Sequence, residues 1–192
     1  MSTSARVLQN IDVCHLISYV DRSSNATRNR VIVLLSFKSG LRASEIAGLD
    51  WSMVLTPAGK MSQLLSLGGH ITKGGSSRRI PIHPDLHAAL SRLHHAARRP
   101  RQGPVIMSAR GSNMRPRSIV NYFAETYAAL GFDGCSSHSG RRTFITQSAK
   151  VLARSGGSLR DIQELAGHRS LTTTERYIQG DRDAQRRLVS LI

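Results

Sequence analysis

Apolar residues recur every three or four positions along much of the chain, and this spacing predicts a largely helical fold. Leu8–Val20 has the pattern of an amphipathic helix, whereas Arg28–Lys38 is apolar enough through its middle to be buried on most sides. Pro84 and Pro116 each open a further helix, and Gly131 ends the second of these. Helices are expected near residues 8–20, 28–38, 43–48, 84–98, 116–130, 137–154, 158–166 and from 171 towards the C-terminus.

Short segments between about residues 51 and 82 have the composition of β-strands. Gly74 and Gly75 suit a hairpin turn ahead of the last of these segments. We expect one strand near residues 51–54 and, around the turn, a sheet formed by residues 63–67, 70–72 and 79–82. The fold class that follows is mainly α with a small antiparallel three-stranded β-sheet.

The charge of the chain narrows the class of partner. Its 27 Lys and Arg residues exceed its 12 Asp and Glu residues, which gives a net charge of +15 at pH 7. Most of this charge is arginine, whose planar guanidinium binds phosphate through parallel hydrogen bonds. Nucleic acid is therefore the expected partner. Ribosomal and membrane-surface proteins are also basic, so charge alone does not select DNA.

Two further properties exclude other classes of protein. No apolar run approaches the ~18 residues of a membrane span, and the first residues lack the apolar stretch of a secretory signal. Cys14 and Cys135 are too few for a disulfide scaffold or a zinc site. We therefore expect a cytoplasmic protein that enters no membrane and has no zinc site. If DNA is its partner, we also expect it to be nucleoid-associated, and we expect it to use no metal ion or other cofactor.

Four short segments carry residues that suit phosphate chemistry. They are Ser39–Glu45, Thr72–Ile82, His138–Phe144 and Leu165–His168. Tyr177 follows nine residues after His168. A tyrosine beside arginines and histidines can attack a phosphodiester while the cationic side chains hold the phosphate. Each segment alone is a weak signal, but their order and their distances together form a specific pattern.

This set of segments resembles the tyrosine recombinase (phage integrase) family, over roughly residues 25–180. The resemblance implies the fold of that family's catalytic domain. It also implies a site-specific DNA recombinase of a mobile element, which integrates, excises or inverts DNA through a covalent 3′-phosphotyrosine intermediate. In size and layout the chain is similar to the fimbrial-switch invertases, which are small stand-alone members of the family.

The resemblance implies a catalytic set of six residues. They are Arg42, Lys73, His138, Arg141, His168 and Tyr177. Tyr177 would be the nucleophile, and because a free phenol has a pKa of ~10 it needs assistance to attack at neutral pH. Arg42 and Arg141 would hold the non-bridging phosphate oxygens, over which the transition state spreads negative charge.

The other three members of the set would transfer protons or bind the phosphate. His138 would take the tyrosine proton or hold the phosphate, and His168 would donate a hydrogen bond to a phosphate oxygen. Lys73, at the hairpin tip, would protonate the leaving 5′-oxygen. Outside the family pattern each would be an ordinary packed or solvated residue, and the sequence does not show which of Arg141 and Arg142 points inward.

Further arginines are expected to contact DNA. They are Arg78, Arg79, Arg110, Arg115, Arg117 and Arg142. Those beside Pro116 flank the start of a helix, whose positive end also favours phosphate. Such contacts raise affinity and its salt dependence but read little base sequence. Gly140, where the family often has an apolar residue, is interpreted as a place where the backbone could approach DNA closely.

The expected layout is a single catalytic domain spanning residues 1–192, with residues 1–24 as an N-terminal helix or arm and no separate N-terminal core-binding domain. Residues 178–192 form a tail with an apolar end, which could fold back on its own domain. The resemblance favours docking of this tail on a neighbouring protomer. The implied partners are double-stranded DNA with inverted-repeat sites, further copies that complete a tetramer on DNA, and an accessory DNA-bending protein.

Other functions remain open at the level of the sequence. A type IB topoisomerase-like enzyme would nick and close DNA with the same chemistry, without paired sites or a docking tail. A catalytically silent DNA-binding regulator would explain the charge, but the intact six-residue set argues against it. A ribosomal or RNA-binding protein would also explain the charge and would leave the set unexplained.

Overall fold

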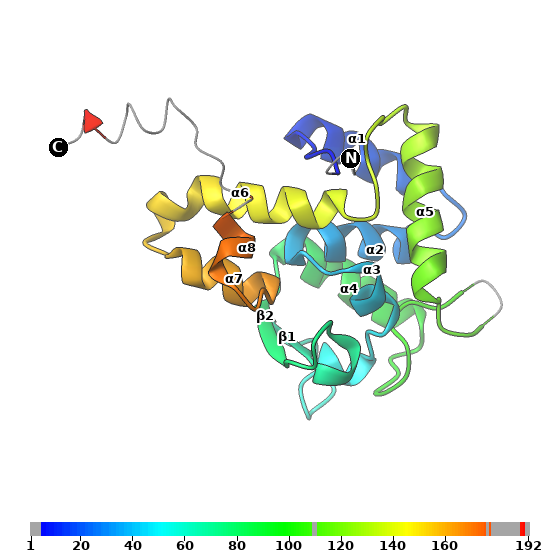
Figure 1. Ribbon diagram of the computed structural model, residues 1–192. Helices are drawn as coiled ribbons and strands as arrows, with labels where there is room; N and C mark the ends of the chain where they lie inside the picture. The colour runs from blue at the N-terminus through cyan, green and yellow to red at the C-terminus, as the bar shows by residue number, and fades with distance from the viewer. Residues whose placement is uncertain (1–4, 109–110, 176, 178–188, 191–192) are drawn as a thin grey trace.

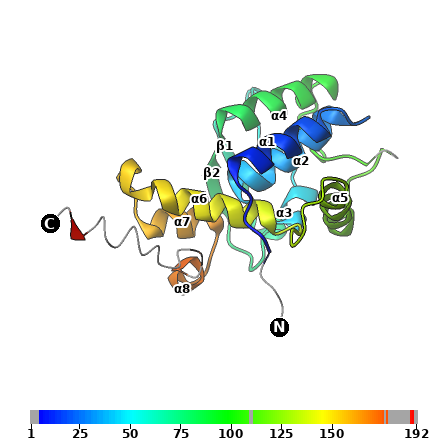
Figure 2. The ribbon, with the colours of Figure 1, turned by 90° about the horizontal axis from the view of Figure 1, so that it is seen from above.

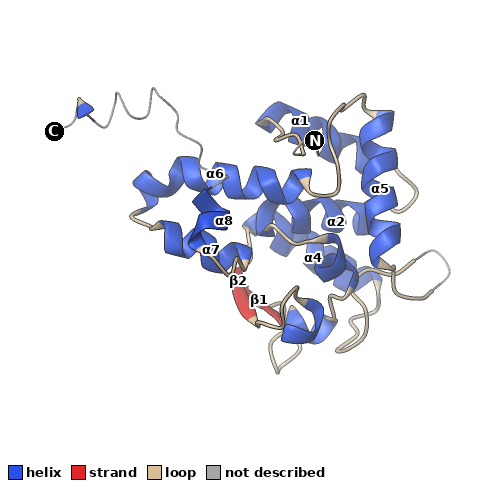
Figure 3. Ribbon diagram, viewed as in Figure 1, coloured by secondary structure: helices blue, strands red, loops and turns tan. Residues whose placement is uncertain are grey.

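The protein is described by a computed structural model, and the described residues are 5–108, 111–175, 177 and 189–190. Its regular secondary structure consists of helices and one β-hairpin (Figure 1). The helices are α1 (Asn10–Val20), α2 (Ala26–Ser39), α3 (Ala43–Ala47), α4 (Pro84–Ala96), α5 (Pro116–Ala129), α6 (Ser139–Ser155), α7 (Leu159–Ala166) and α8 (Leu171–Glu175). The short 3-10 helices are η1 (Trp51–Met53) and η2 (Gly69–Ile71), and the strands are β1 (Leu64–Leu67) and β2 (Arg78–Pro81). Figure 3 shows the predominance of helix, so the mainly α fold class is confirmed.

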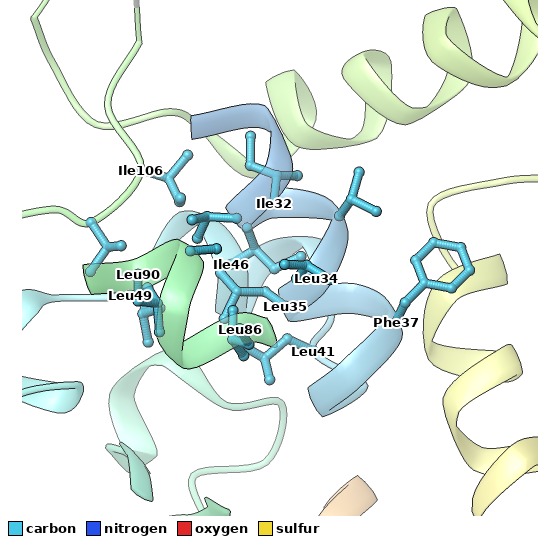
Figure 4. Packing of buried hydrophobic residues seen from close by; sticks show 14 of the residues in the cluster. Ile32, Leu34, Leu35, Phe37, Leu41, Ile46, Leu49, Leu86, Leu90 and Ile106 are labelled. Carbon is cyan, nitrogen blue, oxygen red and sulfur yellow. The ribbon is translucent and has the colours of Figure 1, made fainter. Parts of the chain in front are cut away.

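Helix α2 forms the centre of the hydrophobic core. Every residue from Val31 to Leu35 is 0 % exposed, which confirms the expectation of a helix buried on most sides. Helices α4 and α6 pack against it, and Figure 2 shows α1, α2 and α4 lying next to one another. In Figure 4, Leu34 and Leu35 of α2 lie beside Leu86 of α4. Burial of each such side chain contributes ~1.5–3 kcal/mol.

The sheet has two strands within the described residues, and the expectation of three was wrong. Strands β1 and β2 pair antiparallel, with Leu65 opposite Ile80. Residues 70–72 do not extend the sheet, because the chain there forms the 3-10 helix η2, in which the Ile71 amide donates to the Gly68 carbonyl at 3.2 Å. A turn of this kind satisfies its backbone groups locally and leaves none for strand pairing.

The strand expected near residues 51–54 is also absent, because the chain forms η1 there. Asp50 caps this turn: its carboxylate accepts from the Ser52 amide at 2.8 Å and from the Gly103 amide at 2.7 Å. Local bonds from an Asp side chain to the backbone compete with strand pairing. Asp50, two residues before Ser52, therefore favours a turn at this point, although the segment that follows is apolar.

Helix α6 lies close against α2 at Gly140. A Cβ atom on Gly140 would collide with the Ser36 hydroxyl and would lie 2.9 Å from the Phe37 ring. Phe37 points towards α6 in Figure 4, and Gly140 itself is buried. The missing side chain therefore serves helix packing. The interpretation that Gly140 lets the backbone approach DNA is not supported, because α2 covers this side of the helix.

A second, smaller apolar cluster joins α7 to α6. Ile145 of α6 packs with Ile162 and Ala166 of α7, and Tyr177 lies against this cluster. The helix expected from residue 171 onwards is described as far as Glu175, and most of the expected tail lies outside the described residues. Among the described helices, none is both long enough and apolar enough to span a bilayer.

Candidate active site

Four of the six expected catalytic residues lie together, with His168 in contact with Tyr177 and close to two arginines. Arg42 precedes α3, Arg141 lies in the first turn of α6, His168 follows α7 and Tyr177 follows α8. The charges of both arginines act on the His168 imidazole, and the Tyr177 ring stacks on it with the centroids 5.7 Å apart. Arg42 and Tyr177, which are 135 positions apart in the sequence, thus belong to one site.

Arg141 is the most buried cation of the site, at 4 % exposed. Its terminal nitrogens donate to the carbonyls of Gly40, after α2, and Ala166, at the end of α7, at 2.7 and 2.6 Å. Helix C-termini attract positive charge, so one side chain joins two helix ends. Burial, and then the charge of Arg42, lowers the pKa of Arg141 to about 10, which leaves it charged at neutral pH. Of the adjacent pair, Arg141 is the arginine that points inward.

A buried carboxylate, Glu45, holds two further arginines. Its oxygens accept from the two terminal nitrogens of Arg78 at 2.8 and 2.9 Å. They also accept from the Arg42 guanidinium at 3.1 Å and from the Arg42 amide at 2.9 Å, at the start of α3. Burial alone would raise the pKa of Glu45, but the hydrogen bonds and charges of Arg78 and Arg42 hold it below its ordinary value. Glu45 is therefore ionised.

Arg78 has a structural role that the sequence did not reveal. Its side chain is 9 % exposed, and its Nε donates to the Leu165 carbonyl at 3.2 Å in addition to the two bonds to Glu45. A single residue thus joins the hairpin to α3 and α7. Its expected contact with DNA stays a prediction.

His168 is held as a neutral imidazole. Gly167, in the left-handed conformation with φ of 62°, ends α7 and turns the chain so that His168 follows. Burial, and then the charges of Arg141 and Arg42, lowers the pKa of His168 to about 4. Its Nδ1 lies 2.9 Å from the hydroxyl of Thr174. A neutral imidazole beside arginines whose charge exceeds that of Glu45 suits an anionic ligand, because the ring can donate a hydrogen bond without repelling those cations.

Tyr177 is partly buried, and its ring contacts two other side chains. The His168 ring lies nearly parallel to it, at 17°, and the guanidinium carbon of Arg142 lies 5.8 Å from its centroid. A guanidinium at this distance is attracted by the aromatic face. Arg142 therefore belongs to the surroundings of the tyrosine, and its expected contact with DNA stays a prediction.

The other two expected catalytic residues, Lys73 and His138, are exposed at the margin of this group. Lys73 lies at the hairpin tip and lines, together with His168, a groove of about 490 Å³. The tip is tethered, because Arg169 donates to the Gly74 carbonyl at 2.8 Å. His138 immediately precedes α6, and its ring has no hydrogen-bond partner within the described part of the chain.

The remaining arginines of the expected DNA surface lie on several elements. Arg79 is exposed on β2, while Arg115 and Arg117 are exposed at the start of α5. Arg110 lies outside the described residues. Contact of these arginines with DNA stays a prediction.

Thr174 and Arg169 contact the site, and sequence reasoning assigned neither of them a role. Glu45 could be recognised, because it follows Arg42 at the three-residue spacing of a helix-capping pair. Thr174 and Arg169 carried no such signal. Their partners, His168 and the Gly74 carbonyl, become neighbours only when the chain folds.

The fold and these side chains define a helical domain with a cationic group of side chains beside a tyrosine. The family model described as the phage integrase family matches residues 6–183. The chain therefore belongs to the phage integrase family.

Curated relatives agree with this assignment. The tyrosine recombinase XerC of Nitrobacter winogradskyi is 36% identical over 155 residues, which cover 78% of this chain and 45% of the relative. XerC of Myxococcus xanthus is 35% identical over 163 residues, which cover 79% and 50%. The chain thus spans about half the length of the curated relatives it matches.

Solved structures show the same fold. The Tn1549 transposon integrase, in complex with transposon right end DNA, has a TM-score of 0.78 at 16% identity, over 100% of this chain and 67% of that chain. XerA recombinase has a TM-score of 0.75 at 20% identity, over 100% and 66%. The integrase of mycobacterium phage Brujita has a TM-score of 0.62 at 27% identity, over 97% and 57%. The expected tyrosine recombinase catalytic-domain fold is confirmed.

Proposed function

We propose that this chain forms the catalytic centre of a site-specific DNA recombinase, which cuts and rejoins strands to integrate, excise or invert DNA. The observation that carries the proposal is the group formed by Arg42, Arg141, neutral His168 and Tyr177. Membership of the phage integrase family and the similarity to proteins named tyrosine recombinase XerC support it.

The proposed reaction begins with attack on the scissile phosphate. The Tyr177 oxygen forms a bond to phosphorus as its proton passes to His138. The bond from phosphorus to the 5′-oxygen breaks, and this oxygen takes a proton from Lys73. The products are a 3′-phosphotyrosine and a free 5′-hydroxyl. Another 5′-hydroxyl then attacks phosphorus and gives its proton to Lys73, while the bond from phosphorus to Tyr177 breaks and the tyrosine takes back its proton from His138, so DNA is rejoined. Because the covalent link retains the bond energy, no nucleotide cofactor is needed.

The two catalytic arginines are suited to the charge that develops during this attack. Arg141 is held by two backbone carbonyls and Arg42 by Glu45, so neither side chain has to be reoriented as the phosphate oxygens gain charge. Removal of one such donor typically lowers the rate by ~10²–10³. His168 adds one hydrogen bond from its neutral ring.

The proposed partner is double-stranded DNA with inverted-repeat sites. The net charge of +15 and the exposed Arg79, Arg115 and Arg117 favour it, and the lambda integrase was solved as a dimer bound to a core site. We further propose a tetramer on DNA, docking of residues 178–192 on a neighbouring protomer, and help from a DNA-bending protein at the nucleoid. The repeated basic surface of several copies would hold two sites together.

Covalent capture tests the proposed function. Nicked duplexes from the DNA that flanks the gene would be mixed with the native chain or with Tyr177→Phe, which retains the ring but lacks the nucleophile. Cleavage beside the nick releases a short strand and traps the intermediate. The expected result is a denaturant-resistant protein–DNA adduct with the native chain alone, formed without added metal or nucleotide.

Two other outcomes would favour the alternative functions. Adduct formation together with relaxation of supercoiled plasmids that lack the inverted repeats would favour a type IB topoisomerase-like enzyme. Tight binding to the duplexes without any adduct would overturn the proposal in favour of a catalytically silent regulator.

A further inference from the structure

We propose that the buried hydroxyl of Thr174 donates its hydrogen bond to Nδ1 of His168 and thereby holds the imidazole in the tautomer that carries its proton on Nε2. Thr174 would then be a positioning residue, because it acts on the phosphate only through His168. The consequence for DNA cleavage rests on the proposed function, whereas the tautomer can be measured without it.

The direction of this hydrogen bond follows from the burial of Thr174. Its side chain is 0 % exposed, so water cannot accept the hydroxyl proton. Within the described part of the chain, the 2.9 Å contact with His168 is the only hydrogen bond of this hydroxyl. A buried donor without an acceptor is strongly disfavoured. The hydroxyl proton therefore lies on the line to Nδ1, which must be unprotonated to accept it.

The opposite arrangement leaves a buried proton without a partner. If Nδ1 carried the proton and donated to Thr174, the hydroxyl would need a second acceptor. The usual acceptor for a helical threonine is the carbonyl four residues earlier, here that of Ser170. That carbonyl accepts from the Thr173 amide at 3.2 Å, and no bond joins it to the Thr174 hydroxyl. The Nδ1 proton is therefore the less stable alternative.

The backbone holds His168 in the orientation that this contact requires. The His168 amide donates to the Gln163 carbonyl at 3.0 Å, and the Gln163 side chain donates back to the His168 carbonyl at 3.0 Å. The ring is also stacked on Tyr177. With Nδ1 directed at α8, Nε2 lies on the opposite edge of the ring and is left available to a ligand.

The neutral state of the ring makes its tautomer decisive. The cations Arg141 on α6, Arg42 before α3 and Arg78 on β2 all oppose a second proton on His168. A neutral imidazole has one N–H and one lone pair. With the proton on Nε2, the ring donates to a phosphate oxygen. With the proton on Nδ1, it would present a lone pair to that oxygen and repel it.

Three variants separate this role from general packing. Thr174→Val keeps the shape of the buried side chain but removes the hydroxyl, while Thr174→Ser retains the hydroxyl. Thr173→Val makes the same chemical change at the neighbouring position, whose side chain is exposed. Thermal unfolding of each variant would establish that it is folded before the comparison is made.

The first measurement is the tautomer itself. Two-bond ¹H–¹⁵N correlation spectra of the histidine rings distinguish an Nδ1 proton from an Nε2 proton, and a His168→Gln variant assigns the signal. We expect the Nε2 tautomer in the native chain, Thr174→Ser and Thr173→Val, and a mixture in Thr174→Val. An Nδ1 proton in the native chain would overturn the inference, whether or not any variant folds.

The second measurement is single-turnover cleavage of the nicked duplexes. Thr174→Val should lose ~10-fold or more in cleavage rate at unchanged DNA affinity, because the phosphate loses a donor in the transition state. Thr174→Ser should recover most of this rate. An unaltered rate in Thr174→Val with an altered tautomer would overturn the catalytic part of the inference. A native chain that forms no adduct but shows the Nε2 tautomer would contradict the proposed function while supporting the Thr174 assignment.

Discussion

At the scale of single residues, the arginines of the site differ in whether a carboxylate neutralises their charge. Arg42 and Arg78 share the carboxylate of Glu45, whereas the partners of Arg141 among the described residues are backbone carbonyls. These three arginines and one glutamate leave an excess of positive charge, which a phosphodiester would neutralise. Burial, and then this excess of positive charge, explains why His168 remains neutral.

The lowered pKa of His168 predicts a specific dependence of stability on pH. Because the folded state holds the pKa at about 4, below the ordinary value near 6.5, the unfolded chain binds more protons between these values. The contribution of this group to the free energy of unfolding is therefore complete above about pH 6.5 and falls as the pH drops towards 4.

Denaturant unfolding from pH 7.5 to 4 would check this prediction. His168→Gln should lose less stability than the native chain over the interval from pH 6.5 to 4. His95→Gln, at an exposed position on α4, is the matched control and should follow the native curve. Parallel curves for the native chain and His168→Gln would contradict the prediction.

At the scale of elements, the site is built from the ends of helices and one hairpin rather than from a single element. Arg141 ties the C-terminal ends of α2 and α7 together, and Arg78 ties β2 to α3 and α7. Arg169 adds a bond from the segment after α7 to the hairpin tip that carries Lys73. The relative placement of the candidate catalytic side chains therefore depends on contacts between elements.

Substitution of adjacent arginines on β2 tests this role of the hairpin. Arg78→Met removes both bonds to buried Glu45 and should lower the free energy of unfolding by ~3–5 kcal/mol, as is usual when one partner of a buried ion pair is lost. Arg79→Met, on the exposed side of the same strand, should change stability by less than about 0.5 kcal/mol. Denaturant unfolding gives both values, and equal losses would refute the distinction.

The contact between α2 and α6 predicts an unusual effect of alanine. Alanine normally favours a helix over glycine by ~1 kcal/mol. Gly140→Ala should nevertheless destabilise the fold by ~1–3 kcal/mol, because the new Cβ would meet Ser36 and the Phe37 ring. Lys150→Ala, at an exposed position on α6, is the control and should be nearly neutral. Thermal unfolding measures the stability of both variants. A gain of stability in Gly140→Ala would contradict the prediction, because α2 and α6 could then move apart without a cost in free energy.

At the scale of the whole molecule, the net charge of +15 should govern DNA affinity and its dependence on salt. Each lost phosphate contact lowers the slope of log K against log salt by ~0.9. The double substitution Arg115→Gln and Arg117→Gln should therefore reduce the slope by roughly 1–2, with similar loss on specific and nonspecific DNA. Binding titrations from low to high salt measure this, with Arg92→Gln on α4 as the control. A slope that is unchanged would remove the start of α5 from the DNA surface.

The sequence predicted the helices well, because amphipathic spacing and the positions of Pro and Gly are local signals. The apolar run of α2 and the proline that opens α5 each led to bounds within a few residues. The strands were predicted less well. Asp50 and the Gly68–Gly69 pair direct the chain into 3-10 turns through short-range bonds that outweigh a weak strand composition.

What the sequence by itself determined was the helical framework, the family and the identity of the candidate catalytic residues, since these depend on residue types at set distances along the chain. Only the tertiary structure decided that Arg141 rather than Arg142 points inward, that Arg78 is tied to Glu45, and that Thr174 reaches His168. The physical reason is that burial, compensation of charge and hydrogen-bond direction depend on neighbours that are distant in sequence and meet only in the folded chain.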